Sequence, residues 1–449
     1  MSEERETLDL SLTGALNLGG LAPVAEWLDQ KAPHEIAEEL TRLKPVQAAL
    51  VWRMLPRDEA LEVFEELDSV QQQELLSGMR DSAFREVVEE MDPDDRARLL
   101  GEAPAGFVRR VLAGLSHKER AMTASLLGYP EGSVGRVMSP EVVTVQESTP
   151  VPEILDVVRR KGGDAETVDL LAVVDRSQKL VGVVGLSHVV LADPGLTAGE
   201  ISDENAPTLE VTDDAEYAAR LVQETNRLGL MVLDSQSRVL GVLTVDDALE
   251  VIEEADTEDV ARQAGQLPSS SHYLSTSVFQ LAKLRVFWLV ILIAAASGTI
   301  GVMGLFETKL HEITALALFI PLLVGTGGNI GAQAATGAVR ALAVGEVRPS
   351  DVLRVAWRES RVGVFLGVVL GGLAFVAATW VSGLPIGITV GLSIVLIAVW
   401  ATTIGSVMPL AAQAVKIDPA VISAPLVTTL VDMSGLLIYF LVSGLVLGI

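Results

Sequence analysis

The chain has 449 residues, with 33 Lys and Arg against 59 Asp and Glu, a net charge of −26 at pH 7, and no cysteine. The lack of cysteine excludes disulfides, thiolate catalysis and thiolate metal sites. The acidic excess excludes nucleic acid as a partner, because its phosphates would be repelled, and it suits cations. The five histidines show no paired metal spacing, and no nucleophile, base pair or phosphate loop indicates an enzyme.

The charge is distributed unevenly along the chain. Residues 1–282 carry 52 acidic and 24 basic residues, a net charge of −28, whereas residues 283–449 carry seven acidic and nine basic residues, a net charge of +2. Composition therefore predicts an acidic soluble body followed by a membrane domain. Residues 1–30, an N-terminal tail, lack a basic and then apolar signal pattern, so we expect the soluble body on the cytoplasmic side.

Residues 31–130 are expected to form an acidic helical domain built from a repeat. VFEELD at 63–68 recurs as VVEEMD at 87–92, an offset of 24 residues. Short helical repeats cannot bury their apolar faces alone, so they stack into a superhelix. Three residues one repeat apart are expected to cap successive helices: Asp68, Asp92 and Ser116.

Residues 135–252 contain a second duplication. AVVDRSQKLVGVVGLSHVVLADP from Ala172 and MVLDSQSRVLGVLTVDDALEVIEE from Met231 align with an offset of 59 residues. Each copy predicts strand, turn, strand and capped helix, an α+β unit. The duplication resembles a tandem pair of CBS domains, which commonly bind adenosyl ligands or pair with each other. ATP stays an open question here, because Ser187-His188 and Val245-Asp246 replace the basic residue or Thr/Ser-Asp pair usual before the helix.

Residues 246–275 are expected to form an acidic helix that connects the soluble body to the membrane domain. Glu250 and Glu254 stand one turn apart, and such like-charge pairs repel by about 0.2–0.5 kcal/mol. A hard divalent cation would relieve the repulsion, and oxygen-only ligands favour Mg²⁺ or Ca²⁺, whereas a solvated acidic face is the alternative. The acids expected to bind regulatory cations in the helical domain and this helix are Asp94, Asp95, Asp246, Asp247, Glu250, Glu253, Glu254, Asp256, Glu258 and Asp259.

Residues 283–449 are expected to cross the membrane as five helices, because each of five apolar runs approaches the roughly 20 residues that crossing requires. Arginines gather between the second and third runs, which places the N-terminus in the cytoplasm and the C-terminus outside. The five runs lie at 285–306, 313–342, 357–381, 385–412 and 421–447.

The second run contains LLVGTGGNIGAQAATGAVRAL, in which glycines surround Asn329. We expect these glycines to break or thin the helix where polar backbone faces a cavity. Close helix packing is the alternative interpretation. The amide oxygen of Asn329 can bond to the water shell of a metal ion. The glycines concerned are Gly325, Gly327, Gly328 and Gly331.

The fifth run contains DPAVISAPLVTTLVDMSGLLIY and places one carboxylate, Asp432, in a segment otherwise suited to lipid. A charge at the bilayer centre costs about 2.5–3.5 kcal/mol on insertion scales, so such a residue usually faces a water-filled path. Ala424, Thr428 and Asp432 share one helical face, which predicts a pore wall. A carboxylate that serves only helix packing is the alternative.

The order of these segments, with VGTGGNIGAQAATGAVRAL in the second run and DPAVISAPLVTTLVDMSGLLIY in the fifth, resembles the MgtE family of magnesium channels over essentially the whole chain. The resemblance implies a multidomain fold with an α-helical superhelical N-domain, tandem CBS domains, a connecting helix and a five-helix transmembrane domain. It also implies a homodimer in the lipid of the plasma membrane, Mg²⁺ entry along the two-fold axis, and closure by cytosolic Mg²⁺. By position, the implied pore residues are Asp432, Asn329, Thr428 and Asp418.

Two departures from the family pattern and two alternatives remain. Ala424 stands where the family usually has Asn, and Asn226 where it often has an acid. A transporter of Co²⁺ or Mn²⁺ is one alternative, although no Cys or His lies near Asp432 in the sequence. A non-transporting membrane sensor is the other. One Asp432 per subunit of a symmetric dimer would match a single divalent cation, and Mg²⁺ suits a path with few direct ligands because it dehydrates reluctantly.

Overall fold

The computed structural model describes residues 12, 16, 22–43, 45–67, 69–77, 87–101, 103–268 and 276–448, and these form two compact units. The first contains the described residues up to Ala255 together with Thr276, and the second contains the described residues from Asp256 onward except Thr276. Asp68, one of the predicted caps, lies outside the described residues.

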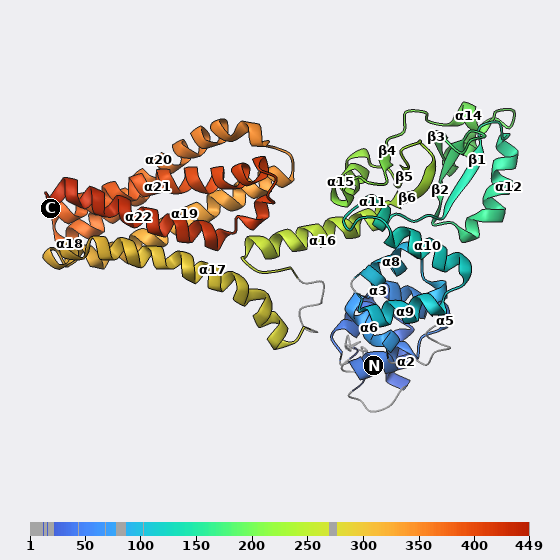
Figure 1. Cartoon of the computed structure of the whole chain (residues 1–449), viewed down its shortest axis with the longest axis horizontal. Coiled ribbons are helices and arrows are strands. Elements are labelled where there is room, and N and C mark those ends of the chain that lie inside the picture. The colour runs from blue at the N-terminus through green and yellow to red at the C-terminus, as the bar shows by residue number, and fades with distance from the viewer. Residues whose placement is uncertain are drawn as a thin grey trace, which may run out of the picture. The chain divides into compact units, whose positions relative to one another are not determined.

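Short helices make up the N-terminal part of the first unit (Figure 1). The predicted repeat is confirmed, because α6, α8 and α10 begin at Ser69, Pro93 and His117, each 24 residues after the last. The Ser116 hydroxyl caps α10 by accepting a hydrogen bond from the Glu119 backbone N–H. The helices share one apolar core. They are α2 (Ala22–Leu28), α3 (Pro33–Thr41), α4 (Pro45–Trp52), α5 (Arg57–Glu65), α6 (Ser69–Ser77), α8 (Pro93–Gly101), α9 (Ala105–Gly114) and α10 (His117–Leu127).

Two three-stranded sheets confirm the second duplication. Their orders are β1-β2-β3 and β4-β5-β6, and in each sheet the first pair is parallel and the second antiparallel. The hairpin turns also match, because Gln178 and Ser237, 59 positions apart, have φ values of 64° and 61°. The strands are β1 (Val142–Gln146), β2 (Thr167–Val174), β3 (Leu180–Gly185), β4 (Thr208–Glu210), β5 (Gly229–Leu233) and β6 (Val239–Thr244).

The two copies of this α+β unit share a small core that contains Ala172 and Val183 from one and Met231 and Val242 from the other. The expected side-chain cap is absent from α13, which begins after Gly185. The helices and the 3₁₀ turn of this region are α11 (Val134–Val137), α12 (Val151–Lys161), η1 (Gly162–Asp164), α13 (Leu186–Leu191), α14 (Ala198–Ile201), α15 (Ala215–Thr225) and α16 (Val245–Gln263).

The described part of the second unit contains five helices that are long and apolar enough to cross a membrane, as predicted (Figure 1). The first begins earlier than expected, at Val278, because polar residues precede the apolar run within the same helix. The elements are α17 (Val278–Leu305), α18 (Glu307–Glu312), α19 (Ala315–Ala343), η2 (Pro349–Asp351), α20 (Val352–Ser382), α21 (Leu384–Ala414), η3 (Pro419–Val421) and α22 (Ala424–Leu447).

Two exposed tryptophans mark the ends of α20. Trp357 is 67% exposed and Trp380 is 88% exposed. Their separation of 23 residues corresponds to about 35 Å along a helix, close to the roughly 30 Å hydrocarbon core of a bilayer. Tryptophan is enriched at membrane interfaces, so the spacing supports a transmembrane position for α20.

The glycine-rich segment of α19 does not break the helix, and that expectation is wrong: α19 is continuous from Ala315 to Ala343. The glycines instead let side chains of neighbouring helices pack directly against the α19 backbone. A Cβ on Gly327 would lie 2.6 Å from the Ile397 side chain, and one on Gly331 would lie 3.0 Å from Val431. Close packing, the alternative interpretation, therefore explains these two glycines.

A second set of glycines lets α20 pack closely against α21. A Cβ on Gly367 would lie 2.8 Å from the Val395 Cα, and one on Gly371 would lie 2.7 Å from the Gly391 carbonyl oxygen. The contacts are with backbone, which cannot move as a side chain can. These two glycines follow Gly363 at four-residue spacing, the pattern of close helix contact in membranes.

Replacing Gly367 by Ala should destabilise the membrane domain by about 1–3 kcal/mol, because the added methyl group overpacks the α20–α21 contact. Thermal unfolding of the full-length protein in detergent measures the effect. Gly372→Ala is the matched control, because a Cβ there meets nothing within 4 Å. Equal unfolding temperatures for the two variants would contradict a tight contact at Gly367.

Candidate functional site

The carboxylate of Asp432 lies on α22 where this helix meets α19. A Cβ on Gly328 would lie 3.0 Å from the Asp432 Oδ1 and 2.6 Å from the Thr428 Cγ2, so the glycine brings the α19 backbone against the acid. Asp432 Oδ1 is buried and has no hydrogen-bond partner among the described residues. A buried carboxylate oxygen without a hydrogen-bond partner raises the free energy of the folded state, so we expect a bound ligand to satisfy it.

The other predicted pore residues differ in their surroundings. The Thr428 hydroxyl donates to the Gly328 carbonyl at 3.3 Å, which links α22 to α19. Asn329 is exposed on α19. Ala424 begins α22 after Ser423, whose hydroxyl accepts a hydrogen bond from the Leu426 N–H at 3.4 Å. The structure therefore brings Thr428 to Asp432 and leaves Asn329 on an open face.

Asp418 contacts a helix outside the five spans. Its Oδ1 accepts a hydrogen bond from the Ala420 N–H at 2.8 Å, and its Oδ2 pairs with the Arg262 guanidinium. Arg262 also pairs with Glu258 on α16. Asp418 thus joins the end of α16 to the turn between α21 and α22.

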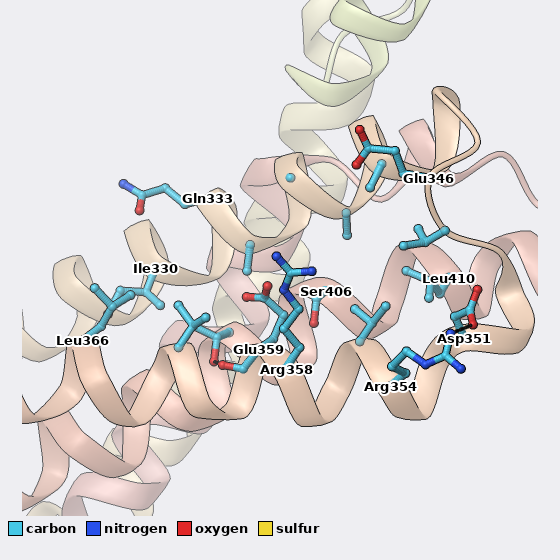
Figure 2. A pocket seen from close by; sticks show the side chains of 18 residues that line it. Ile330, Gln333, Glu346, Asp351, Arg354, Arg358, Glu359, Leu366, Ser406 and Leu410 are labelled. Carbon is cyan, nitrogen blue, oxygen red and sulfur yellow. Dashed lines mark hydrogen bonds and ion pairs between the residues drawn. The ribbon is translucent and has the colours of Figure 1, made fainter.

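A separate cavity of about 520 Å³ lies between α19, α20 and α21 (Figure 2). Its wall carries Arg358 and Glu359 beside the hydroxyl-bearing Thr402 and Ser406. The two hydroxyls are satisfied by backbone carbonyls, since Thr402 donates to the Glu359 carbonyl of α20 at 2.9 Å and Ser406 to the Thr403 carbonyl of α21 at 3.1 Å. None of the four predicted pore residues lines this cavity, which is therefore distinct from the Asp432 site.

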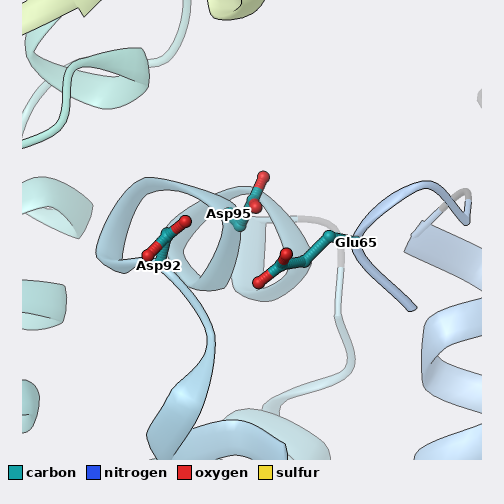
Figure 3. A group of neighbouring side chains, drawn as sticks. All are labelled: Glu65, Asp92 and Asp95. Atoms are coloured by element: carbon teal, nitrogen blue, oxygen red, sulfur yellow. The ribbon is translucent and has the colours of Figure 1, made fainter. Parts of the chain in front are cut away.

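A group of three carboxylates lies in the helical part of the first unit (Figure 3). Glu65 ends α5, Asp92 precedes α8, and Asp95 lies in the first turn of α8. One oxygen from each lies within 4.8 Å of the others. Burial, with the nearby charges of Asp95 and Asp92, raises the pKa of Glu65 to about 8. A divalent cation would compensate these charges, and hard carboxylate oxygens suit Mg²⁺ or Ca²⁺.

A cavity of about 40 Å³ lies beside this group, between α8 and α16. Asp94 is only 6% exposed, lines the cavity, and has an Oδ1 without a partner among the described residues. Burial, with the nearby Asp247, raises the pKa of Asp94 well above its usual value. The carboxylates that line the cavity are Asp94, Asp95, Asp247, Glu250 and Glu254.

The structure thus divides the ten acids predicted to bind regulatory cations. Five line the cavity. The negative charge of a sixth, Asp246, helps to raise the pKa of Asp247. Glu258 belongs to the Arg262 pair, and Glu253 is exposed on α16. Asp256 and Asp259, also on α16, lie outside the cavity lining.

Three carboxylates of this region are not among those predicted from the sequence: Glu65 and Asp92, which belong to the three-carboxylate group, and Glu166, which interacts with Asp92 and Asp247. Glu166 precedes β2, and burial together with the charges of Asp92 and Asp247 raises its pKa to about 7. The sequence signal for Glu65 and Asp92 was the repeat itself, which places both at repeat positions. No sequence signal marks Glu166, because only the tertiary fold brings it to the others.

These raised pKa values predict a pH-dependent stability. Glu65 and Glu166 have pKa values of about 8 and 7 in the folded protein, above the ordinary value of about 4.5 for a glutamate carboxyl. The folded state therefore holds more protons than the unfolded state between about pH 4.5 and 8, so stability should fall as pH rises through this window, by about 1.4 kcal/mol per pH unit for each extra proton. Exchange protection of the α8 amides, corrected for intrinsic rates and measured without divalent cations, tests the sign. Excess Mg²⁺ should flatten the slope, and a slope of opposite sign would contradict the assignment.

Comparison with known proteins adds family information. A family profile described as MgtE, divalent cation transporter, matches residues 320–442. A profile for the MgtE intracellular N domain matches residues 31–132, and one for the CBS domain matches residues 134–195 and 198–254. The magnesium transporter MgtE of Thermus thermophilus is 36% identical over 447 residues, 98% of this chain and 99% of the relative. The magnesium transporter MgtE of Bacillus subtilis is 27% identical over 414 residues, 92% and 91% of the two chains.

A solved structure resembles the soluble part. It is the cytosolic domain of the Mg²⁺ channel MgtE in complex with ATP, with 33% sequence identity and a TM-score of 0.50. The match covers 54% of this chain and 98% of that structure.

Proposed function

Because this chain belongs to the MgtE family of divalent cation transporters, we propose that it carries Mg²⁺ across a membrane. The observation that carries the proposal is Asp432, whose buried Oδ1 has no partner among the described residues and lies within a helix suited to lipid. An unpaired intramembrane carboxylate usually marks an ion path. The full-length relative from Thermus thermophilus, named a magnesium transporter, supports Mg²⁺ as the substrate.

The path we propose runs between two copies of the chain, along the faces of α19 and α22. Two Asp432 carboxylates about a two-fold axis supply two negative charges for one divalent ion. Thr428, Asn329 and Asp418 complete the path. Mg²⁺ keeps most of its water shell, so a path with few direct ligands is sufficient.

A sensor in the soluble part regulates this path in our proposal. The protein lies in the plasma membrane with its N-terminus in the cytoplasm, and Mg²⁺ enters the cell. Cytosolic Mg²⁺ binds the carboxylates around Asp94, Asp95 and Asp247 and stabilises the closed state, because it binds that state more tightly than the open one. The Arg262–Asp418 pair supports a mechanical link, since it ties α16 to the turn before α22.

Flux into proteoliposomes tests the transport proposal. Purified protein should admit Mg²⁺ to a Mg²⁺-sensitive dye inside the vesicles, and Mg²⁺ should outcompete Co²⁺ and Mn²⁺. Flux of Co²⁺ or Mn²⁺ in preference would favour the transporter of another divalent cation. No flux of any divalent cation would favour the non-transporting sensor.

ATP is a second candidate ligand of the soluble part. One observation favours it: the solved cytosolic domain with 33% sequence identity contains ATP. Calorimetric titration of this protein with ATP, with and without Mg²⁺, distinguishes a nucleotide-binding CBS pair from one that serves only as a scaffold.

A further inference from the structure

The acidic cavity between α8 and α16 contains a positive charge supplied by the protein itself. Arg98 on α8 donates from Nη2 to the Asp95 Oδ1 at 2.5 Å, and its other terminal nitrogen, Nη1, pairs with Glu250 on α16. Its guanidinium lines the same cavity as Asp94, whose Oδ1 has no partner in the described part of the chain. The positive charge of Arg98 also favours the ionised form of the Asp247 carboxyl. One arginine therefore bridges two of the five carboxylates that line the cavity.

Arg98 is positioned to leave the cavity as well as to occupy it. Its side chain is 38% exposed, and Glu250 is 53% exposed. Arg96, two residues earlier on the same helix, differs: it is fully buried and fixed by Glu119 at 2.9 Å and Thr123 at 3.1 Å. Arg96 thus fixes α8, whereas the contacts of Arg98 can exchange with solvent.

A cation and Arg98 would compete for the same carboxylate oxygens, because Arg98 pairs with Asp95 and Glu250 in the cavity wall. The space left in the cavity beside Arg98 is about 40 Å³, which corresponds to about three water molecules. A partly hydrated divalent cation bound to Asp95 and Glu250 would take the oxygens that Arg98 holds. The second arginine of the lining, Arg136, donates to the Leu127 carbonyl at 2.8 Å and is held by that backbone contact.

We infer that Arg98 is a tethered competitor of the regulatory cation, and that it sets the Mg²⁺ concentration at which the sensor responds. The inference rests on the proposed sensor and adds a threshold-determining residue to it. In the ion-free state the guanidinium binds Asp95 and Glu250. When Mg²⁺ binds, the guanidinium swings into solvent and the divalent charge replaces the single one. The apparent affinity for Mg²⁺ therefore equals the intrinsic affinity multiplied by the fraction of molecules in which Arg98 has left Asp95 and Glu250.

Hydrogen exchange of residues 246–260 in the full-length protein, across a Mg²⁺ series, measures the midpoint of the response. Arg98→Gln should lower this midpoint by about fivefold, the range expected for a partly exposed ion pair. Arg98→Lys keeps the charge with fewer donors, so its midpoint should lie between those of Arg98→Gln and the parent protein. Arg109→Gln is the matched control, because it removes the same charge from an exposed position on α9 outside the cavity, and its midpoint should not change.

An unchanged or raised midpoint in Arg98→Gln would overturn the inference while leaving the sensor intact. If Arg98→Gln does not fold, a midpoint in Arg98→Lys equal to or above that of the parent protein would overturn it equally. A parent protein that shows no Mg²⁺-dependent protection would overturn both the sensor and the competitor. If the Mg²⁺ midpoint fell equally in Arg98→Gln and Arg109→Gln, the effect would be due to net charge alone, and Arg98 would not be a competitor of the cation.

Discussion

Replacing Asp432 by Asn should lower Mg²⁺ uptake by at least about 100-fold, because a dimer would lose both of the negative charges that attract the divalent ion inside the membrane. A 100-fold loss corresponds to about 2.7 kcal/mol. Asn has the same shape, so the contact between α22 and the Gly328 backbone should survive. Uptake by cells that lack other Mg²⁺ transporters measures the loss. The amount of protein in the membrane should stay unchanged, since removing a buried charge does not impede insertion.

Asp351→Asn is the control for this experiment. Asp351 lies in the described η2 turn before α20 and pairs with Arg354 at 2.9 Å, outside the proposed path. Its loss should leave uptake near that of the parent protein. If Asp432→Asn kept more than half of the uptake, Asp432 would be a packing residue and the proposed path would be wrong.

Replacing Asp94 and Asp247 together by Asn should remove the Mg²⁺-dependent protection of α16. In the parent protein, Mg²⁺ at 100 times its dissociation constant should stabilise the bound state by about 2.7 kcal/mol, about 100-fold in exchange protection. The double variant has fewer ligands for the ion. It also lacks two carboxylates whose pKa values burial raises, so its ion-free state should be more protected than that of the parent.

The control for this variant removes the same formal charge elsewhere in the first unit. Asp156 on α12 and Asp169 on β2 are exposed and lie outside the acidic cavity. The Asp156→Asn, Asp169→Asn protein should keep the full Mg²⁺ response. A response that persisted in the Asp94, Asp247 variant, at the same midpoint, would place the sensor elsewhere.

Features that repeat along the chain could be predicted from the sequence. The 24-residue repeat reappears as the regular starts of α6, α8 and α10, because each helix forms from a short local stretch of sequence and packs against its neighbours. The 59-residue duplication reappears in the two sheets and even in the positive φ of Gln178 and Ser237. The five spans follow from apolar runs, which need no tertiary information.

Features that depend on which surfaces meet could not be predicted. Glycines around Asn329 are compatible with a broken helix and with close packing, and only the positions of Ile397 and Val431 decide for packing. Arg262 and Asp418 are 156 residues apart, so no spacing rule links them. The pKa of Glu166 is likewise raised by the charges of Asp92 and Asp247, which only the tertiary fold brings near it.

The central claim is that one protein combines a Mg²⁺ path with a sensor that closes it. Currents through planar bilayers that contain the purified protein test this claim most directly, with Mg²⁺ varied only on the side of the soluble domains. We predict Mg²⁺ currents at low Mg²⁺ on that side, which decline to closure as the concentration rises into the millimolar range. Currents that do not respond to Mg²⁺ on that side, or no current at any concentration, would contradict the account.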